Sequence, residues 1–144
     1  MLMGLIKDLR MKFLVITLIL STMLFVVAAC SSDKVSLGQE FSLRIGESVS
    51  IRGEELQVRF LGVTEDSRCP RGVVCVWEGR VSCLVEITYR ESIHRIVLTE
   101  PGLTSWPPEN SFKEYKITYH VEPYPQAGSE IALEEYRLVL RISK

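Results

Sequence analysis

From residue 41 onward, hydrophobic and polar residues alternate along most of the chain, as in strands with one buried face. The alternation is clearest from Val81 to Tyr89, where every second residue is apolar or cysteine. Further strands are predicted at 41–45, 49–51, 56–60, 93–99, 115–121 and 136–142. Gly62 indicates a bulge or bend, and only residues 130–135 favour a helical turn. The pattern predicts an all-β fold: one small β-sandwich, or a barrel-like domain, of about six to eight antiparallel strands.

A continuous apolar run from Phe13 to Val27 precedes these strands. Basic residues Lys7, Arg10 and Lys12 come before it, and small residues follow, which is the layout of a secretory signal. With about fifteen apolar residues, or about seventeen with two alanines, the run only reaches the lower limit for a membrane-spanning helix. A transmembrane anchor and an ordinary signal peptide are the alternatives.

The sequence Val-Ala-Ala-Cys ending at Cys30 resembles the lipobox of bacterial lipoproteins. The resemblance implies that the Cys30 sulfur carries diacylglycerol and that the chain is cut before it. Two or more acyl chains anchor a protein stably, at about 0.8 kcal/mol per buried methylene. We therefore expect a signal peptide at 1–29, a lipidated tether at 30–39 and the β-sandwich domain at 40–144. The expected location is a bacterial cell envelope, on the extracytoplasmic face of a membrane (the outer membrane in a Gram-negative cell).

The distribution of charge narrows the range of partners. The chain has 17 Lys and Arg against 18 Asp and Glu, and the region after residue 29 is the more acidic part. No basic stripe is present, so nucleic acid is not an expected partner. The expected partners are a membrane, through the lipid on Cys30, and an unidentified envelope protein or small ligand. No spacing typical of metal ligands occurs, so neither a metal nor a cofactor is assigned.

Three cysteines remain once Cys30 is assigned to lipidation. Cys69 and Cys75 are six positions apart with a proline and a glycine between them, so their Cα atoms can approach within the roughly 7 Å that a disulfide requires. Cys75 and Cys83 would lie about 25 Å apart along one strand. We expect a Cys69–Cys75 disulfide and a buried free thiol at Cys83, with Cys69–Cys83 as the rival pairing. The spacing differs from that of thiol oxidoreductases.

Residues 65–79 hold the densest group of candidate binding residues, namely Asp66, Arg68, Trp77 and Glu78. One interpretation is structural: the disulfide staples a long connection, Trp77 packs over it, and Arg68 pairs with a neighbouring acid. The other is functional, because loops carried on a rigid β scaffold often present binding residues.

This region also supports a resemblance. Asp-Ser-Arg-Cys-Pro at 66–70 and Val-Trp-Glu-Gly at 76–79 are similar to segments of small uncharacterised bacterial lipoproteins and secreted β domains, as are Pro-Tyr-Pro at 123–125 and Tyr136. The resemblance covers most of 41–142. It implies the boundary of the domain and no catalytic activity.

A second long loop spans residues 101–112. Trp106 precedes two prolines and is therefore expected to be extended. It either closes one end of the sandwich together with Phe112 or, together with Tyr124, forms an aromatic contact for a ligand or protein.

The leading hypothesis is a non-enzymatic, membrane-tethered binding or interaction module, since no catalytic set is evident. One alternative is an envelope hydrolase or redox protein that uses Asp66, His94 or the cysteines, and another is a purely structural envelope protein. We expect His94 to be partly buried and His120 to be solvated. Convergence of an acid and His94 in one cleft would favour an enzyme.

Overall fold

The computed structural model describes Lys12 and residues 33–102 and 107–144. The chain divides into two units at Ser31 and Ser32, and the second unit contains the folded domain. Cys30 and Trp106, two of the residues with an expected role, lie outside the described residues. Within the described part, no helix is both long and apolar enough to cross a membrane.

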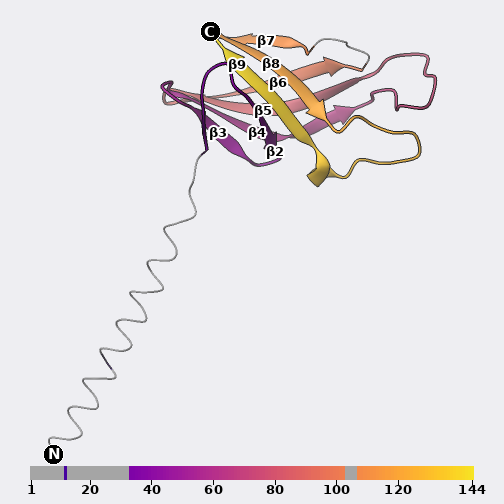
Figure 1. Cartoon of the computed structure of the whole chain (residues 1–144), viewed down its shortest axis with the longest axis horizontal. Coiled ribbons are helices and arrows are strands. Elements are labelled where there is room, and N and C mark those ends of the chain that lie inside the picture. The colour runs from indigo at the N-terminus through magenta and orange to yellow at the C-terminus, as the bar shows by residue number, and fades with distance from the viewer. Residues whose placement is uncertain (1–11, 13–32, 103–106) are drawn as a thin grey trace, which may run out of the picture. The chain divides into compact units, whose positions relative to one another are not determined.

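The described residues form two packed, mainly antiparallel β-sheets, so the predicted all-β class and sandwich architecture are confirmed (Figure 1). One sheet has the order β1-β3-β4-β5-β6 and the other β2-β9-β8-β7. The strands are β1 (Lys34–Val35), β2 (Glu40–Arg44), β3 (Ser48–Ile51), β4 (Leu56–Asp66), β5 (Arg80–Tyr89), β6 (Ser92–Pro101), β7 (Glu109–Phe112), β8 (Tyr115–Glu122) and β9 (Arg137–Ser143). A short 3-10 turn, η2 (Leu133–Glu135), falls within the predicted helical segment.

The core lies between the sheets and is built from the apolar positions of the alternation. Phe60 in β4 and Leu138 in β9 are fully buried, one from each sheet. Burial of one such side chain contributes about 1.5–3 kcal/mol. The other buried apolar residues include Leu43, Val49, Ile51, Leu56, Val58, Val81, Val85, Ile87, Leu98, Ile117, Val121, Leu140 and Ile142.

The bulge expected near Gly62 is present. The register between β4 and β5 shifts between Phe60 and Gly62 and again between Val63 and Glu65. Pairing then continues until Asp66 lies opposite Val81, so β4 is longer than its predicted span. This extension brings Asp66 to the end of the sheet.

Two short strands were not expected. β1 pairs in parallel with β3, and the Gly38 N–H donates to the Ile142 carbonyl at 2.7 Å. The folded domain therefore includes part of the segment assigned to the tether at 30–39. β7 lies inside the second long loop and pairs only with the first half of β8, as far as Thr118.

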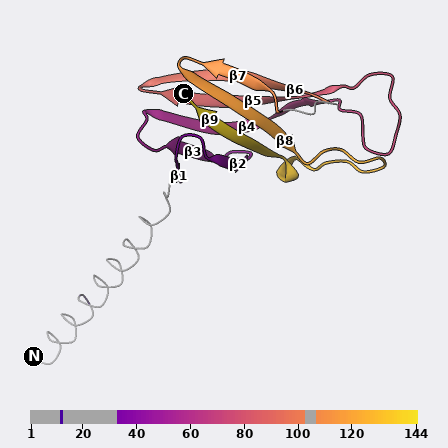
Figure 2. The same cartoon turned by 45° about the horizontal axis from the view of Figure 1, so that its top comes forward.

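The sandwich has two distinct ends. β4, β6 and β8 finish at one end, where β5 and β9 begin, and Figures 1 and 2 show the long β4–β5 and β8–β9 connections there. We call it the loop end. The pairing of β1 with β3, of β3 with β4 and of β4 with β5 places Lys34 of β1 at the same height in the sheet as Thr88 of β5. The β4–β5 connection leaves the sheet beyond the height of Val81 in β5. Seven strand positions separate these levels, roughly 23 Å, so the chain enters the sandwich at the opposite end.

Candidate binding site at the loop end

The predicted disulfide joins Cys69 and Cys75, whose Cα atoms are 5.9 Å apart. Cys83 is a free, buried cysteine on the core face of β5, as expected. Burial and, secondarily, the negative charge of Glu100 raise the pKa of the Cys83 thiol to about 12. A thiol held neutral in this way is neither a nucleophile nor a metal ligand.

The disulfide closes residues 69–75, and exposed apolar side chains lie within this ring and directly after it. In this stapled loop (residues 69–79), Val76 is 90 % exposed and Trp77 is 82 % exposed, while Val74 is fully exposed and Val73 about half. The expectation that Trp77 packs over the disulfide is therefore wrong. The loop extends past the ends of both sheets, and no helix or strand of the described residues lies opposite its tip (Figure 1).

The base of the stapled loop is held firmly. The Ser67 N–H donates to the Arg80 carbonyl at 2.8 Å, and the Cys69 N–H donates to the Glu78 carbonyl at 3.1 Å. Gly102 also packs closely against the base, since a Cβ atom built on it would lie 1.9 Å from the Glu78 carbonyl oxygen. The exposed tip is thus carried on a closely packed base.

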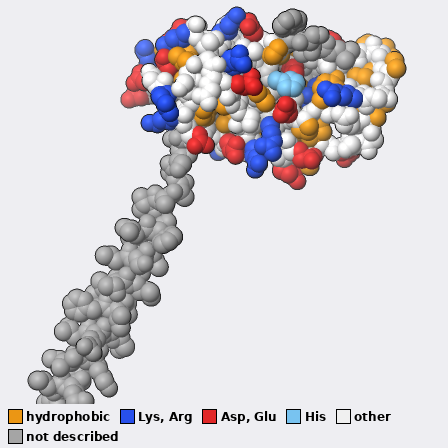
Figure 3. Space-filling model, in the orientation of Figure 1, with side chains coloured by type: hydrophobic (Ala, Val, Ile, Leu, Met, Phe, Trp, Pro, Cys, Tyr) orange, Lys and Arg blue, Asp and Glu red, His pale blue; other side chains and the backbone are white. Residues whose placement is uncertain are grey.

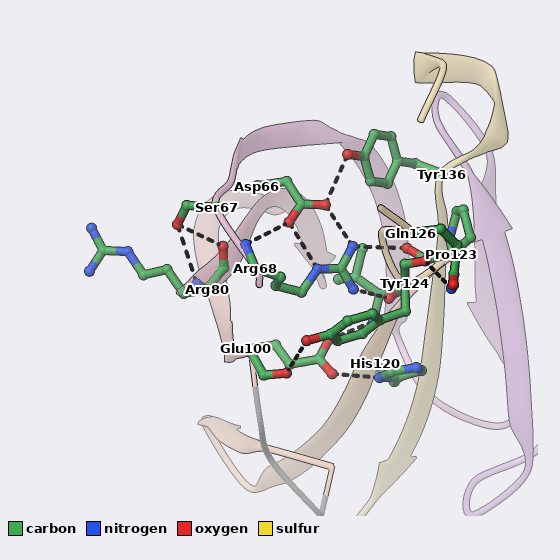
Figure 4. Close-up of polar contacts among 12 residues, drawn as sticks. Asp66, Ser67, Arg68, Arg80, Glu100, His120, Pro123, Tyr124, Gln126 and Tyr136 are labelled. Carbon is green, nitrogen blue, oxygen red and sulfur yellow. Dashed lines mark hydrogen bonds and ion pairs between the residues drawn. The ribbon is translucent and has the colours of Figure 1, made fainter. Parts of the chain in front are cut away.

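Arg68, at the start of the stapled loop, is the most deeply buried charged residue of the network in Figure 4. Its side chain has no exposed area. Its Nε and Nη2 donate to the two carboxylate oxygens of Asp66 at 2.9 and 2.6 Å. Its Nη1 donates to the Val121 carbonyl at 2.8 Å, and Nη2 also donates to the Pro123 carbonyl at 2.9 Å. The expected pairing of Arg68 with a neighbouring acid is confirmed.

The same contacts keep Asp66 ionised. Burial raises the pKa of Asp66, but the hydrogen bonds and charge of Arg68, together with the Tyr136 hydroxyl donating at 3.0 Å, outweigh it, so the pKa lies below its ordinary value. Burial and the hydrogen bond to Asp66 raise the pKa of Tyr136 to about 12.

Glu100 and His120 form a second polar pair beside the first. Glu100 is buried, and one of its oxygens accepts the Val121 N–H at 2.7 Å while the other is hydrogen-bonded to His120 Nδ1. That hydrogen bond is the main reason why the pKa of His120 is raised. The His120 side chain is 42 % exposed, so it is partly solvated as expected, but its hydrogen bond to Glu100 was not expected.

Arg68 and Glu100, one from each polar pair, supply hydrogen bonds to the backbone at an edge of the second sheet. β7 stops at the position opposite Thr118, so the last part of β8 is paired with β9 on one side but has no described strand beside it on the other. The Val121 N–H is taken up by Glu100, and the Val121 and Pro123 carbonyls by Arg68. Side chains therefore satisfy backbone groups that would otherwise be unpaired.

Tyr124 links the polar network to the stapled loop. Its ring lies under the guanidinium groups of Arg68 and Arg71, with their Cζ atoms 5.0 and 5.1 Å from the ring centroid. Its hydroxyl donates to the Gly102 carbonyl at 2.6 Å. Of the candidate binding residues, Asp66, Arg68 and Tyr124 thus come together, whereas Trp77 and Glu78 lie on the exposed loop.

Sequence reasoning did not find three members of this network, Glu100, His120 and Tyr136. A signal was available for Glu100, because it shares the core-facing side of β6 with Leu98. An acid at such a position requires partners.

The structure does not bring Asp66 and His94 together. Along β5, Asp66 pairs opposite Val81 and His94 opposite Ile87, six positions or about 20 Å away. The ring of His94 instead contacts Phe112, with centroids 5.2 Å apart. Asp66 and His94 therefore do not share one cleft.

Two open depressions adjoin the network. One of about 390 Å³ lies between the stapled loop and Tyr124, with Glu100 and His120 in its lining. The other, of about 800 Å³, extends from Arg71 across the ends of β2, β8 and β9. Within residues 33–102 and 107–144, no group of three or more His, Cys, Asp and Glu side chains could hold a metal ion.

The protein thus contains a small β-sandwich domain whose loop end carries a stapled apolar loop, with a buried polar network beneath that loop. Comparison with protein families, with curated proteins and with solved structures finds no match to this chain.

Proposed function

We propose that this protein is a lipid-anchored binding module of a bacterial envelope and that the tip of the stapled loop contacts a partner protein. The observation that carries the proposal is the exposure of Val74, inside the ring closed by the Cys69–Cys75 disulfide, and of Val76 and Trp77, which directly follow it. Tryptophan is enriched among residues that dominate binding energy at interfaces. A loop already held in one conformation loses less entropy on binding than a free segment does.

The position of the loop supports the proposal. A chain anchored at Cys30 enters the domain through β1, at the end opposite the stapled loop. A hydrolase that uses Asp66 and His94 has less support because these residues lie about 20 Å apart. A redox protein has less support because the thiol of Cys83 is buried and Cys69 and Cys75 are joined to each other.

Photocrosslinking in the producing bacterium tests the proposal. A photoreactive p-benzoylphenylalanine replaces Val74 or Val76 in the full chain, and Ile93, 65 % exposed at the other end of β6, serves as the control position. We expect one envelope protein to be linked from both loop positions and not from the control. The purified partner should then bind the full chain, with its affinity reduced about tenfold or more by Trp77→Ser.

Two results would contradict the proposal. One is an adduct pattern that is the same at Ile93 as at the loop positions. The other is a purified partner whose affinity is unchanged by Trp77→Ser. Because Trp77 is so exposed, its substitution should not impair folding.

A further inference from the structure

In the described part of the chain, β6 is the only long strand at the edge of a sheet. It has ten residues and ends the five-stranded sheet, whereas the other edge strands, β1, β2 and β7, have two, five and four. Proteins usually shorten, bulge or charge such an edge, because its unpaired backbone is a template for another chain. β6 pairs with β5 without a register shift, and from Ile93 to Thr99 its only Lys, Arg, Asp or Glu is Arg95. β6 therefore lacks the usual protection against the addition of a further strand.

The free edge of β6 carries the backbone groups of its odd-numbered residues. The Gly102 N–H donates to the Gly79 carbonyl at 3.0 Å, and hydrogen-bonded residue pairs alternate along antiparallel strands. The even-numbered residues of β6 thus direct their backbone groups towards β5, and residues 93, 95, 97 and 99 direct theirs to the edge. In agreement, the Thr99 carbonyl accepts the Tyr119 hydroxyl at 2.8 Å. Among the described residues, no other backbone group bonds to the backbone at 93, 95 or 97.

The side chains extend an apolar row across the sheet to this edge. Ile93 is 65 % exposed and Val97 is 53 % exposed. Val97 pairs opposite Leu84 of β5, and Leu84 pairs opposite Gly62, which follows Leu61 in β4. Both leucines are half-buried, and neither packs against the core. The other face of the sandwich differs, because basic and acidic side chains are intermixed over β8 and β9 (Figure 3).

We infer that β6 pairs antiparallel with β6 of a second copy of this chain, about a two-fold axis at Val97. The two copies then present the same edge to each other, as a symmetric dimer requires. Val97 lies opposite Val97 of the second copy, Arg95 opposite its Thr99, and Ile93 opposite its Pro101. Because the facing residues are the odd-numbered ones, their free backbone groups meet, and the apolar row continues from one sheet into the next.

This register avoids opposed charges. Arg95 faces a neutral residue and keeps its own ion pair with Glu86 at 3.1 Å. An axis at Arg95 would instead place two guanidinium groups opposite each other, which is destabilising. The antiparallel pairing puts the two loop ends at opposite ends of the joined sheet. The dimer does not use the tip of the stapled loop, so it does not depend on the proposed partner contact.

Cysteine trapping in the full chain, purified in a mild detergent, tests the register. Val97→Cys brings two thiols together across the axis, where Cα atoms of directly opposite residues lie about 5.5 Å apart, within reach of a disulfide. Ile93→Cys is the matched control, since it is on the same strand and at least as exposed. Its two copies would be separated by eight strand positions, roughly 26 Å. With oxidised glutathione, Val97→Cys should form a covalent dimer about tenfold faster than Ile93→Cys. The unmodified chain reports any linkage through its own cysteines.

Sedimentation equilibrium tests the association without a crosslink. We expect a monomer–dimer equilibrium with a Kd of about 0.1 mM or tighter. Val97→Lys should remain folded, because the side chain is exposed, and should weaken the dimer about tenfold or more by opposing two charges at the axis. Trp77→Ser should dimerise as the unmodified chain does. A chain that stays monomeric at about 0.5 mM, a dimer unaffected by Val97→Lys, or equal rates of trapping at 97 and 93 would overturn the inference.

Discussion

Replacing Arg68 with methionine tests whether the buried ion pair holds the loop end together. Methionine keeps the length and apolar stem of the side chain but removes all four of its side-chain hydrogen bonds. It leaves the Asp66 carboxylate, with an 11 % exposed side chain, without its counter-charge. Removing one partner of a buried pair costs about 3–5 kcal/mol. That is a large fraction of the roughly 5–15 kcal/mol by which domains are stable.

Urea unfolding of the full chain, followed by circular dichroism, measures this cost, and the chain supplies its own control. Arg80 and Glu65 form an ion pair at 3.3 Å in which both side chains are about half exposed. Arg80→Met should therefore cost no more than about 1 kcal/mol. If Arg68→Met costs no more than Arg80→Met, the reasoning about the buried pair is wrong.

The dependence on pH gives a second check on the same variant. The pKa of Asp66 is lowered in the folded protein, so its ionisation stabilises the fold above about pH 4, and this contribution is lost as the pH falls through the folded value. In Arg68→Met, burial without the counter-charge should raise the pKa of Asp66 instead. Acidification from pH 7 towards pH 4 should then relieve part of the penalty. An identical pH profile in the two proteins would refute this account.

Three further predictions concern other parts of the loop end and the core. Gly102→Ala should destabilise the fold by about 3 kcal/mol in urea unfolding, because the new Cβ would meet the Glu78 carbonyl oxygen. Cys83 should resist alkylation in the folded protein and react fully in urea, as counted by mass spectrometry, because burial raises its pKa to about 12. His120 has a raised pKa, so its contribution should be present below about pH 6.5 and lost as the pH rises through the folded value. His120→Gln should remove that part of the pH dependence, and a histidine NMR titration showing no raised pKa would contradict it.

The alternation of side chains predicted the long strands because each has one face in the core. It also located the bulge at Gly62, where a glycine interrupts an otherwise regular strand. β1 and β7 were missed for a physical reason: each is short and has a neighbour on only one side, so burial imposes little pattern on it. Their pairing is visible only once the order of the strands is known.

The site was predictable only in part, for a similar reason. Asp66 and Arg68 are two positions apart, so their pairing could be expected from local sequence. Glu100 and His120 belong to strands of different sheets, and only the packing of the sandwich brings them into contact. The exposure of Trp77 runs against the usual tendency of tryptophan to be largely buried. It follows from the position of the loop beyond the ends of both sheets, where no described strand lies opposite its tip.

The two halves of the stapled loop should respond differently to substitution. Its base is continuous with the sandwich through Arg68 and the backbone hydrogen bonds of Ser67 and Cys69, so changes there alter the free energy of unfolding. Its tip makes few contacts with the rest of the domain, so changes at Val76 or Trp77 should leave that free energy within about 0.5 kcal/mol. A side chain that is apolar, exposed and dispensable for stability is costly to keep in water unless it meets another surface. Because the exposed tip contributes little to the stability of the fold, we propose that its apolar side chains are kept for contact with a partner.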